Sequence, residues 1–256
     1  MPTDWTQFTI GQWLLAGLAA VGIGVSKSGL PGVSLLHVVI MASLFGPRES
    51  TGIILPMLVV GDVTAVALFR RHSRWNLLMR TLPAATGGVI LGWVIMAAFP
   101  HWQSGKTIGA IVLALAVMQF LRDWKPAWFE QVPQSVAVGA GFGLLAGATT
   151  MIANAAGPVM GLYLLTVGLP KREFVGTSAW FFLIINLLKV PFSLQLGLIT
   201  SHSLQLNALL APLIIGGLFL GREVVVRLRQ RTFDSLVLIF AVVGAFKLLG
   251  VFEAFS

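Results

Sequence analysis

Long apolar segments follow one another along this chain with almost no charges inside them. A helix that spans a membrane needs about 20 mostly apolar residues. Six segments meet this need, at residues 50–69, 78–99, 104–121, 173–192, 203–220 and 233–250. Over the whole chain 57% of the residues are hydrophobic and only 10% are charged, too few to cover a soluble domain. The sequence therefore predicts an all-α polytopic membrane protein whose surroundings are the lipid bilayer.

Two other apolar regions, residues 8–45 and 135–168, do not fit a single span. Each is too long to cross once and barely long enough to cross twice. Each also contains a break rich in glycine and proline near its middle, where a helix should stop. If each region crosses once, the chain has eight spans. If each break reverses the chain, there are ten segments, and two of them are short: 33–45 and 158–167.

The basic residues distinguish the two topologies, because Lys and Arg collect in cytoplasmic loops. Eight spans divide them six against eight, whereas ten segments divide them twelve against two, with only Arg48 and Lys106 on the minority side. We therefore expect a plasma (inner) membrane protein with both termini outside the cytoplasm. The net charge of +8 then reflects topology, and no nucleic-acid partner is expected. The expected cytoplasmic loops are 70–77, 121–134, 168–173 and 221–232.

The second half of the chain repeats features of the first in the same order. The two broken regions lie about 125 residues apart, and Gly52 precedes Asp62 by the same ten residues that separate Gly176 from Asn186. We expect two repeats, 1–125 and 126–256, each with one broken or re-entrant helical hairpin plus three full spans. Because each half has five segments, the second is inverted. Inverted repeats with corresponding broken helices are typical of secondary transporters.

The two breaks are the best candidates for a binding site. Unwound backbone at membrane depth is tolerated only where it is buried in protein or lines a wet cavity. Helices that begin after Pro31-Gly32 and Gly157-Pro158 would direct their positive dipole ends inward, which favours an anion. The neighbouring hydroxyl, amide and ammonium groups would assist them. The candidate substrate-binding residues are Ser26, Lys27, Ser28, Gly29, Thr149, Thr150, Asn154 and Gly157.

Four polar residues inside apolar segments are candidates for cavity-lining or coupling roles: Asp62, Asn186, Lys189 and His37. An isolated charge in a bilayer is costly and is rarely kept without a partner or a task. Asp62 and Lys189 could form a buried ion pair, or they could line the cavity and couple substrate to protons. Asn186 and Lys189 share a helix face. His37 could carry a proton, or it could simply be packed in the core.

The sequence offers little for catalysis or for cofactors. There is no Cys, the four His do not have metal-ligand spacing, and no nucleotide-binding or hydrolase motif occurs. We expect no catalytic residues, no metal and no cofactor. An intramembrane enzyme would have to use Ser178 and His37 as its nucleophile and base. The glycines at 139, 143 and 147 indicate a helix-packing face.

The chain resembles the sulfite exporter TauE/SafE family, also called the TSUP permeases, over nearly its whole length. The resemblance is carried by the first break with its flanks (residues 22–32), the second break (147–158) and residues 174–179 with Asn186 and Lys189. It implies transport of small sulfur-containing or other organic anions. Family members often have a run of glycines where this chain has Ser26-Lys27-Ser28, so the resemblance does not identify sulfite itself as the substrate.

These observations together predict a secondary transporter of a small anion of the sulfite, thiosulfate or organosulfonate class, working by alternating access. The partners implied are this anion and, as a candidate coupling ion, the proton. A passive anion channel would need the same breaks and remains the alternative. Substrate, direction, coupling ion and oligomeric state are left open by the sequence.

Overall fold

The described part of the chain is helical almost throughout. The computed structural model describes residues 5–30, 32–99, 104–125, 127–130, 135–227, 239 and 241–251, and no strand occurs among them. Its main helices are α1 (Ile10–Ser26), α2 (Val33–Phe45), α3 (Pro47–Phe69), α4 (Trp75–Ala98), α5 (Gly105–Trp124), α7 (Val136–Ala153), α8 (Ala156–Thr166), α9 (Lys171–Gln195) and α10 (Ser201–Arg227). Short helical turns lie at η1 (Trp5–Gln7), η2 (Arg70–His72) and α6 (Ala127–Glu130), and residues 241–248 are helical.

Six helices in the described ranges are long and apolar enough to cross a membrane: Pro47–His72, Trp75–Ala98, Gly105–Trp124, Val136–Ala153, Lys171–Gln195 and Ser201–Glu223. Five of the six predicted spans are confirmed by these helices. The sixth, 233–250, lies partly outside the described residues. Pro31, both chain ends and the loop residues 126, 131–134 and 228–232 also lie outside them. Large apolar side chains such as Leu14 and Met79 are exposed, as expected for a surface that faces lipid.

Side chains at the helix starts explain several of these boundaries. Thr9 caps α1, and its hydroxyl accepts a hydrogen bond from the amide of Gln12, whose side chain in turn accepts from the amide of Thr9. Ser104 and Ser135 cap α5 and α7, where each hydroxyl accepts a hydrogen bond from the backbone N–H three residues later. Such caps satisfy amides that have no partner inside the helix.

Each break reverses the chain, as the ten-segment topology predicts. After the first break α2 returns along α1, so that Gly22 of α1 lies against Val33 and His37 of α2. After the second break α8 returns along α7, and the ring of Tyr163 lies 5.5 Å from that of Phe142 near the start of α7. The short segment predicted at 33–45 has the bounds of α2, and the one predicted at 158–167 is α8.

The loop before α4 lies beside the first turn of α9. Arg74 Nε is 2.6 Å from Glu173 Oε2, and the backbone N–H of Arg74 donates to the hydroxyl of Thr177. This hydrogen bond to Glu173 raises the pKa of Arg74 above its ordinary value. Residues 70–74 and 171–173 are therefore at the same end of the bundle, as ten segments require and eight spans forbid. Which membrane face this end occupies stays a prediction.

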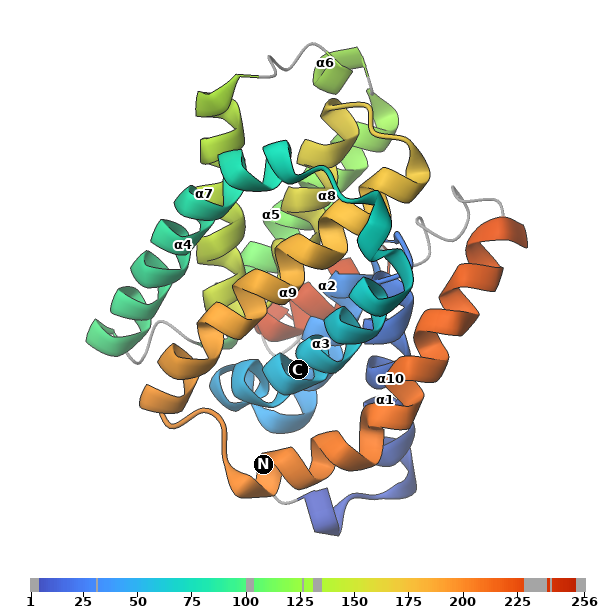
Figure 1. Cartoon of the computed structure of the whole chain (residues 1–256). Helices are drawn as coiled ribbons and strands as arrows, with labels where there is room; N and C mark the ends of the chain where they lie inside the picture. Colours follow the sequence, from blue (N-terminus) through green and yellow to red (C-terminus); the bar gives the residue numbers. More distant parts are fainter. Residues whose placement is uncertain are drawn as a thin grey trace.

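Two close helix pairs form the sides of the bundle, α1 with α10 and α4 with α7 (Figure 1). Glycines permit the contacts: a Cβ on Gly24 of α1 would lie 2.0 Å from the carbonyl oxygen of Ile214, and a Cβ on Gly147 of α7 would lie 2.0 Å from that of Ala85. The packing face predicted at 139, 143 and 147 does contact α4, and Gly139 also faces Tyr163.

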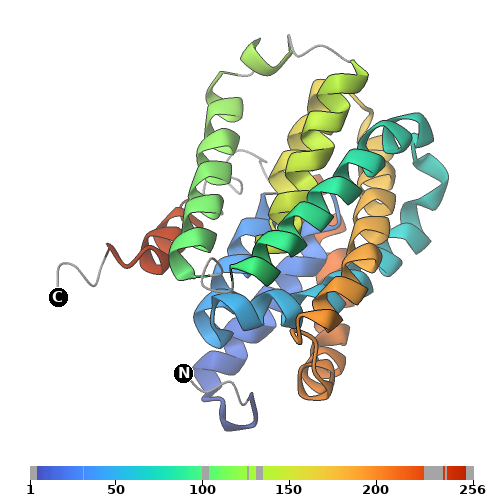
Figure 2. The ribbon, with the colours of Figure 1, turned by 90° about the vertical axis from the view of Figure 1, so that its left-hand side faces the viewer.

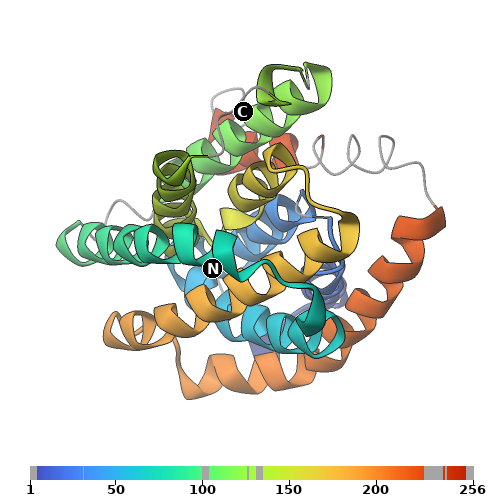
Figure 3. The same cartoon turned by 45° about the horizontal axis from the view of Figure 1, so that its top comes forward.

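Both pairs join the first half of the chain to the second. In the predicted repeat α1 corresponds to α7 and α4 to α10. The α1–α10 pair and the α4–α7 pair are therefore equivalent contacts, each between the first helix of one half and the corresponding later helix of the other half. Helix α9 runs between the two pairs beside α3 (Figure 3), and the helical segment at 241–248 packs on α5 (Figure 2). The repeat and its boundary at residues 125 and 126 stay predictions.

Candidate functional site

Both breaks line one cavity of about 40 Å³ in the interior of the bundle. A water molecule needs roughly 10–15 Å³ by this kind of measure, so the space suits a few waters or one compact ion. The cavity brings together eight of the twelve residues expected at the site: Ser26, Lys27, Gly29, His37, Thr150, Asn154, Gly157 and Asn186.

The first break presents a lysine to the interior. Helix α1 ends at Ser26, and Lys27 is the C-cap of this helix. The hydroxyl of Ser26 donates to the carbonyl oxygen of Ile23. The ammonium of Lys27 lies 2.6 Å from Asp62 Oδ1 on α3 and 4.7 Å from the ring centroid of Phe182 on α9. The lysine stem crosses α3 at Gly61, where an added Cβ would lie 3.3 Å from Lys27 Cγ.

The second break is tighter than expected and is built on Asn154. This residue has φ 53° and ψ 30°, a left-handed conformation that asparagine tolerates better than most residues. Its side-chain N–H₂ donates to the carbonyl oxygen of Thr51 on α3 at 2.9 Å. Helix α8 already begins at Ala156, so the expectation that it starts after Pro158 is wrong. Proline is tolerated there because amides in a first turn have no helical partner.

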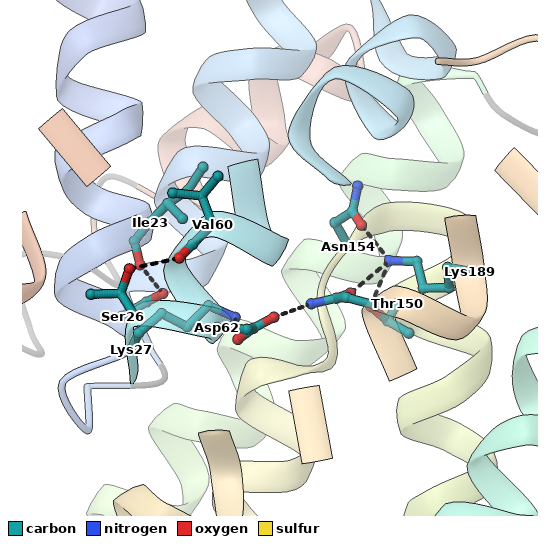
Figure 4. Close-up of polar contacts among 10 residues, drawn as sticks. Ile23, Ser26, Lys27, Val60, Asp62, Thr150, Asn154 and Lys189 are labelled. Carbon is teal, nitrogen blue, oxygen red and sulfur yellow. Dashed lines mark hydrogen bonds and ion pairs between the residues drawn. The ribbon is translucent and has the colours of Figure 1, made fainter. Parts of the chain in front are cut away.

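Asp62 is paired with Lys27, so the interpretation that it forms an ion pair with Lys189 is wrong. The amide group of Asn186 lies between them instead, and its Nδ2 donates to Asp62 Oδ2 at 2.7 Å. Lys27 reaches Asp62 because the end of α1 lies against α3 in the fold (Figure 4). The carboxylate thus has the Lys27 ammonium as an ion-pair partner at one oxygen and the Asn186 amide as a hydrogen-bond donor at the other.

Lys189 on α9 is only 2% exposed and points at three oxygens. Its Nζ lies 2.5 Å from Asn154 Oδ1, 3.0 Å from Thr150 Oγ1 and 3.3 Å from Asn186 Oδ1 (Figure 4). An ammonium has three N–H donors, so every donor has an acceptor. Lys189 therefore ties the second break to Asn186 and, through it, to Asp62.

The result is one continuous polar network from α1 through α3 and α9 to α7. Its charged members are two ammonium groups and one carboxylate, with neutral amides and a hydroxyl between them. Networks of this kind are costly unless every member is satisfied, and here each buried charge has its partners.

Four expected site residues do not line the cavity. Asp62 and Lys189 lie behind it in the network. The hydroxyl of Ser28 donates to the carbonyl oxygen of Val25 and faces Gly221 of α10. Thr149 donates back to its own helix at Leu145. Spacing alone cannot distinguish these neighbours, because the turn after α1 directs Ser28 away from the cavity and helix α7 directs Thr149 away from it.

The cavity also includes residues that the sequence interpretation missed, among them Ser34, Phe182 and the backbone of Ala156. Ser34 shares a face of α2 with His37, three residues away, so helical spacing could have indicated it. Nothing in the sequence distinguishes Phe182. Ser178 and His37 both line the cavity, but neither nitrogen of His37 has a hydrogen-bond partner among the described residues. The structure thus shows no hydrogen bond between this histidine and the Ser178 hydroxyl, the contact that an activating base makes.

Two substitutions at Asn154 separate its backbone role from its side-chain role. We expect Asn154→Gly and Asn154→Ala both to unfold at lower temperature than the wild type, because Lys189 loses its nearest acceptor. The alanine variant should be less stable than the glycine variant by about 1 kcal/mol, since alanine is strained in a left-handed conformation. Thermal unfolding of the detergent-purified proteins measures both effects, and an alanine variant as stable as wild type would contradict them.

Six spanning helices around a buried charged network define a multi-pass membrane protein with an internal polar site. The family model of the sulfite exporter TauE/SafE matches residues 15–248, so the chain belongs to that family of membrane transporters for sulfite-type anions. Searches of the curated proteins and of the solved structures returned no match.

Proposed function

We propose that this protein is a secondary transporter that binds a small oxyanion in the cavity between the two breaks and moves it across the plasma membrane by alternating access. The anion belongs to the sulfite, thiosulfate or organosulfonate class, and the proton is the candidate coupling ion. Membership of the TauE/SafE family supports the substrate class. The single observation that carries the site is that two buried lysines, Lys27 and Lys189, share one buried carboxylate, Asp62, in the network beside the cavity.

Two helix starts add to the attraction for an anion. Ser34 in the first turn of α2 and Gly157 in the first turn of α8 both line the cavity, so the positive ends of two helix dipoles meet there. A unit charge 4 Å from the anion contributes about 4 kcal/mol at the effective dielectric constant typical of proteins. No dedicated cofactor is needed for such binding.

The arrangement of helices suits alternating access. The first break is attached to the α1–α10 pair and the second to the α4–α7 pair, and each pair is held together by backbone contacts at glycines. Rocking of one rigid pair against the other would open the cavity to either side while the glycine contacts stay intact. The predicted inverted repeat provides the two equivalent end states.

The proposal is tested in liposomes that contain the purified protein. With a pH gradient imposed, we expect saturable uptake of sulfite or of a sulfonate, absent from empty liposomes. Asn154→Gly should lower this uptake, whereas Lys106→Gln, a change at an exposed residue at the start of α5, should not. The transporter proposal fails if no anion of the class moves or binds. Flux that neither saturates nor responds to a gradient would favour the passive channel.

A further inference from the structure

The protonation states of the network follow from its hydrogen bonds. Lys189 faces three oxygens, and an ammonium has one N–H donor for each of them. Asp62 has the ammonium of Lys27 at 2.6 Å from Oδ1 and accepts a hydrogen bond from Asn186 at Oδ2, and both contacts favour the ionised carboxylate. With these groups in their charged forms, the network carries two positive charges and one negative charge.

No other carboxylate in the described part of the chain compensates this excess. Asp62 is the only acidic residue that is buried there. Glu49 and Glu173 lie in the first turns of α3 and α9, Glu223 is exposed near the end of α10, and Asp123 pairs with Arg122 near the end of α5. One positive charge thus remains in the protein interior without a counter-charge, next to the cavity.

His37 adds an unused polar group to the cavity. It is fully buried on α2, it lines the cavity, and neither ring nitrogen has a hydrogen-bond partner among the described residues. A charged imidazolium beside Lys27 would need an anionic partner, and Asp62 is already shared by Lys27 and Asn186. A neutral imidazole still has one N–H that can donate to a guest in the cavity.

We propose that this site selects its substrate by valence: it takes oxyanions with a single negative charge and discriminates against those with two. This inference rests on the proposed anion transport and narrows its substrate class. An anion with one negative charge neutralises the excess positive charge of the network. The N–H of neutral His37 donates a hydrogen bond to this anion. A second would remain buried without compensation, which is strongly unfavourable. Hydrogen sulfite and organosulfonates fit this rule, whereas thiosulfate and sulfate do not.

The test compares tetrahedral sulfur anions that differ in one substituent. Methanesulfonate has one charge, and sulfate and thiosulfate have two. Each is titrated into the detergent-purified protein at one neutral pH and constant ionic strength, and binding is measured as the rise in Tm. We expect methanesulfonate to bind at least about tenfold more tightly than either dianion. Equal or tighter binding of a dianion would overturn the valence rule and leave the transport proposal standing.

A charge-neutralising variant tests the same rule without changing the ligand. Asn154→Asp places a carboxylate beside Lys189, keeps the side-chain shape and tolerates the left-handed backbone, although it loses the hydrogen bond to the carbonyl oxygen of Thr51. It brings the network to zero net charge, so methanesulfonate should bind about tenfold more weakly. The matched control, Lys106→Gln, changes an exposed charge and should bind as wild type does. A folded Asn154→Asp variant with unchanged affinity would overturn the inference.

Substitutions at His37 test the neutral donor. His37→Gln keeps an N–H group and should retain most of the methanesulfonate affinity, whereas His37→Phe should lose several-fold, while sulfate remains the weaker ligand in both. If His37→Phe binds as tightly as wild type, the histidine is not a ligand. If none of the three anions raises the Tm of the wild-type protein, the proposed function itself fails.

Discussion

Replacement of Asp62 by alanine should lower the free energy of unfolding by about 3–5 kcal/mol, because it leaves a buried charge without its partner. Lys27 has a side-chain exposure of 7% and its ammonium lies 2.6 Å from the Asp62 carboxylate, so it cannot regain water without movement of α1. Asn186 loses its acceptor at the same time, and the amide that orients Lys189 is released. We expect low yield, a large fall in Tm and no transport.

A double variant shows whether the charge or the side-chain volume is responsible. Lys27→Met with Asp62→Leu removes both charges and keeps apolar bulk, and replacement of buried ion pairs by apolar residues is often neutral or stabilising. The double variant should therefore recover much of the stability that Asp62→Ala loses. It should not recover transport, because the network no longer joins the two breaks. An Asp62→Ala protein with wild-type Tm would show that the pair is not structurally important.

Alanine at Gly147 should destabilise the protein by about 3 kcal/mol, a cost at the upper end for overpacking. The added methyl group would lie 2.0 Å from the carbonyl oxygen of Ala85 and 2.9 Å from the amide nitrogen of Val89. These are backbone atoms of α4, so no side chain can rotate away and the whole helix must shift. The shift moves the end of α7, which carries Thr150 and Asn154, and transport should fall with stability.

Gly141 provides the control on the same helix. A Cβ there meets nothing within 4 Å, so Gly141→Ala should be neutral or slightly stabilising, by up to about 1 kcal/mol from the better helix propensity of alanine. Thermal unfolding of both variants in detergent makes the comparison. Equal Tm values for Gly141→Ala and Gly147→Ala would show that α4 and α7 are not in backbone contact.

Much of the fold follows from local pattern. The lengths of the apolar segments predict five of the spans, and the glycines and prolines mark both places where a broken region reverses. The basic residues favour ten segments, and the contact between Arg74 and Glu173 agrees with that choice. These features are readable because segment length, helix-breaking residues and loop charge act locally along the chain.

The partners in the site are less predictable. Lys27, Asp62 and Lys189 stand out in the sequence because a charge in an apolar segment needs compensation. The sequence does not reveal how these residues are paired. In the structure Asp62 pairs with Lys27, and Asn186 separates Asp62 from Lys189. The atoms of Asp62 and Asn186 that meet belong to residues 124 positions apart. The turn after α1 likewise directs Ser28 away from the cavity, and rotation about α7 directs Thr149 away from it.

The sequence by itself determined that this chain is a multi-pass helical membrane protein with two broken helices and a few charges too costly to be accidental. These properties depend on the composition and length of each segment. Only the folded arrangement shows that Lys27 pairs with Asp62 while Lys189 contacts neutral oxygens, and that α1 packs on α10 and α4 on α7. The reason is that charge compensation depends on distance in space, and backbone contacts between glycines set those distances.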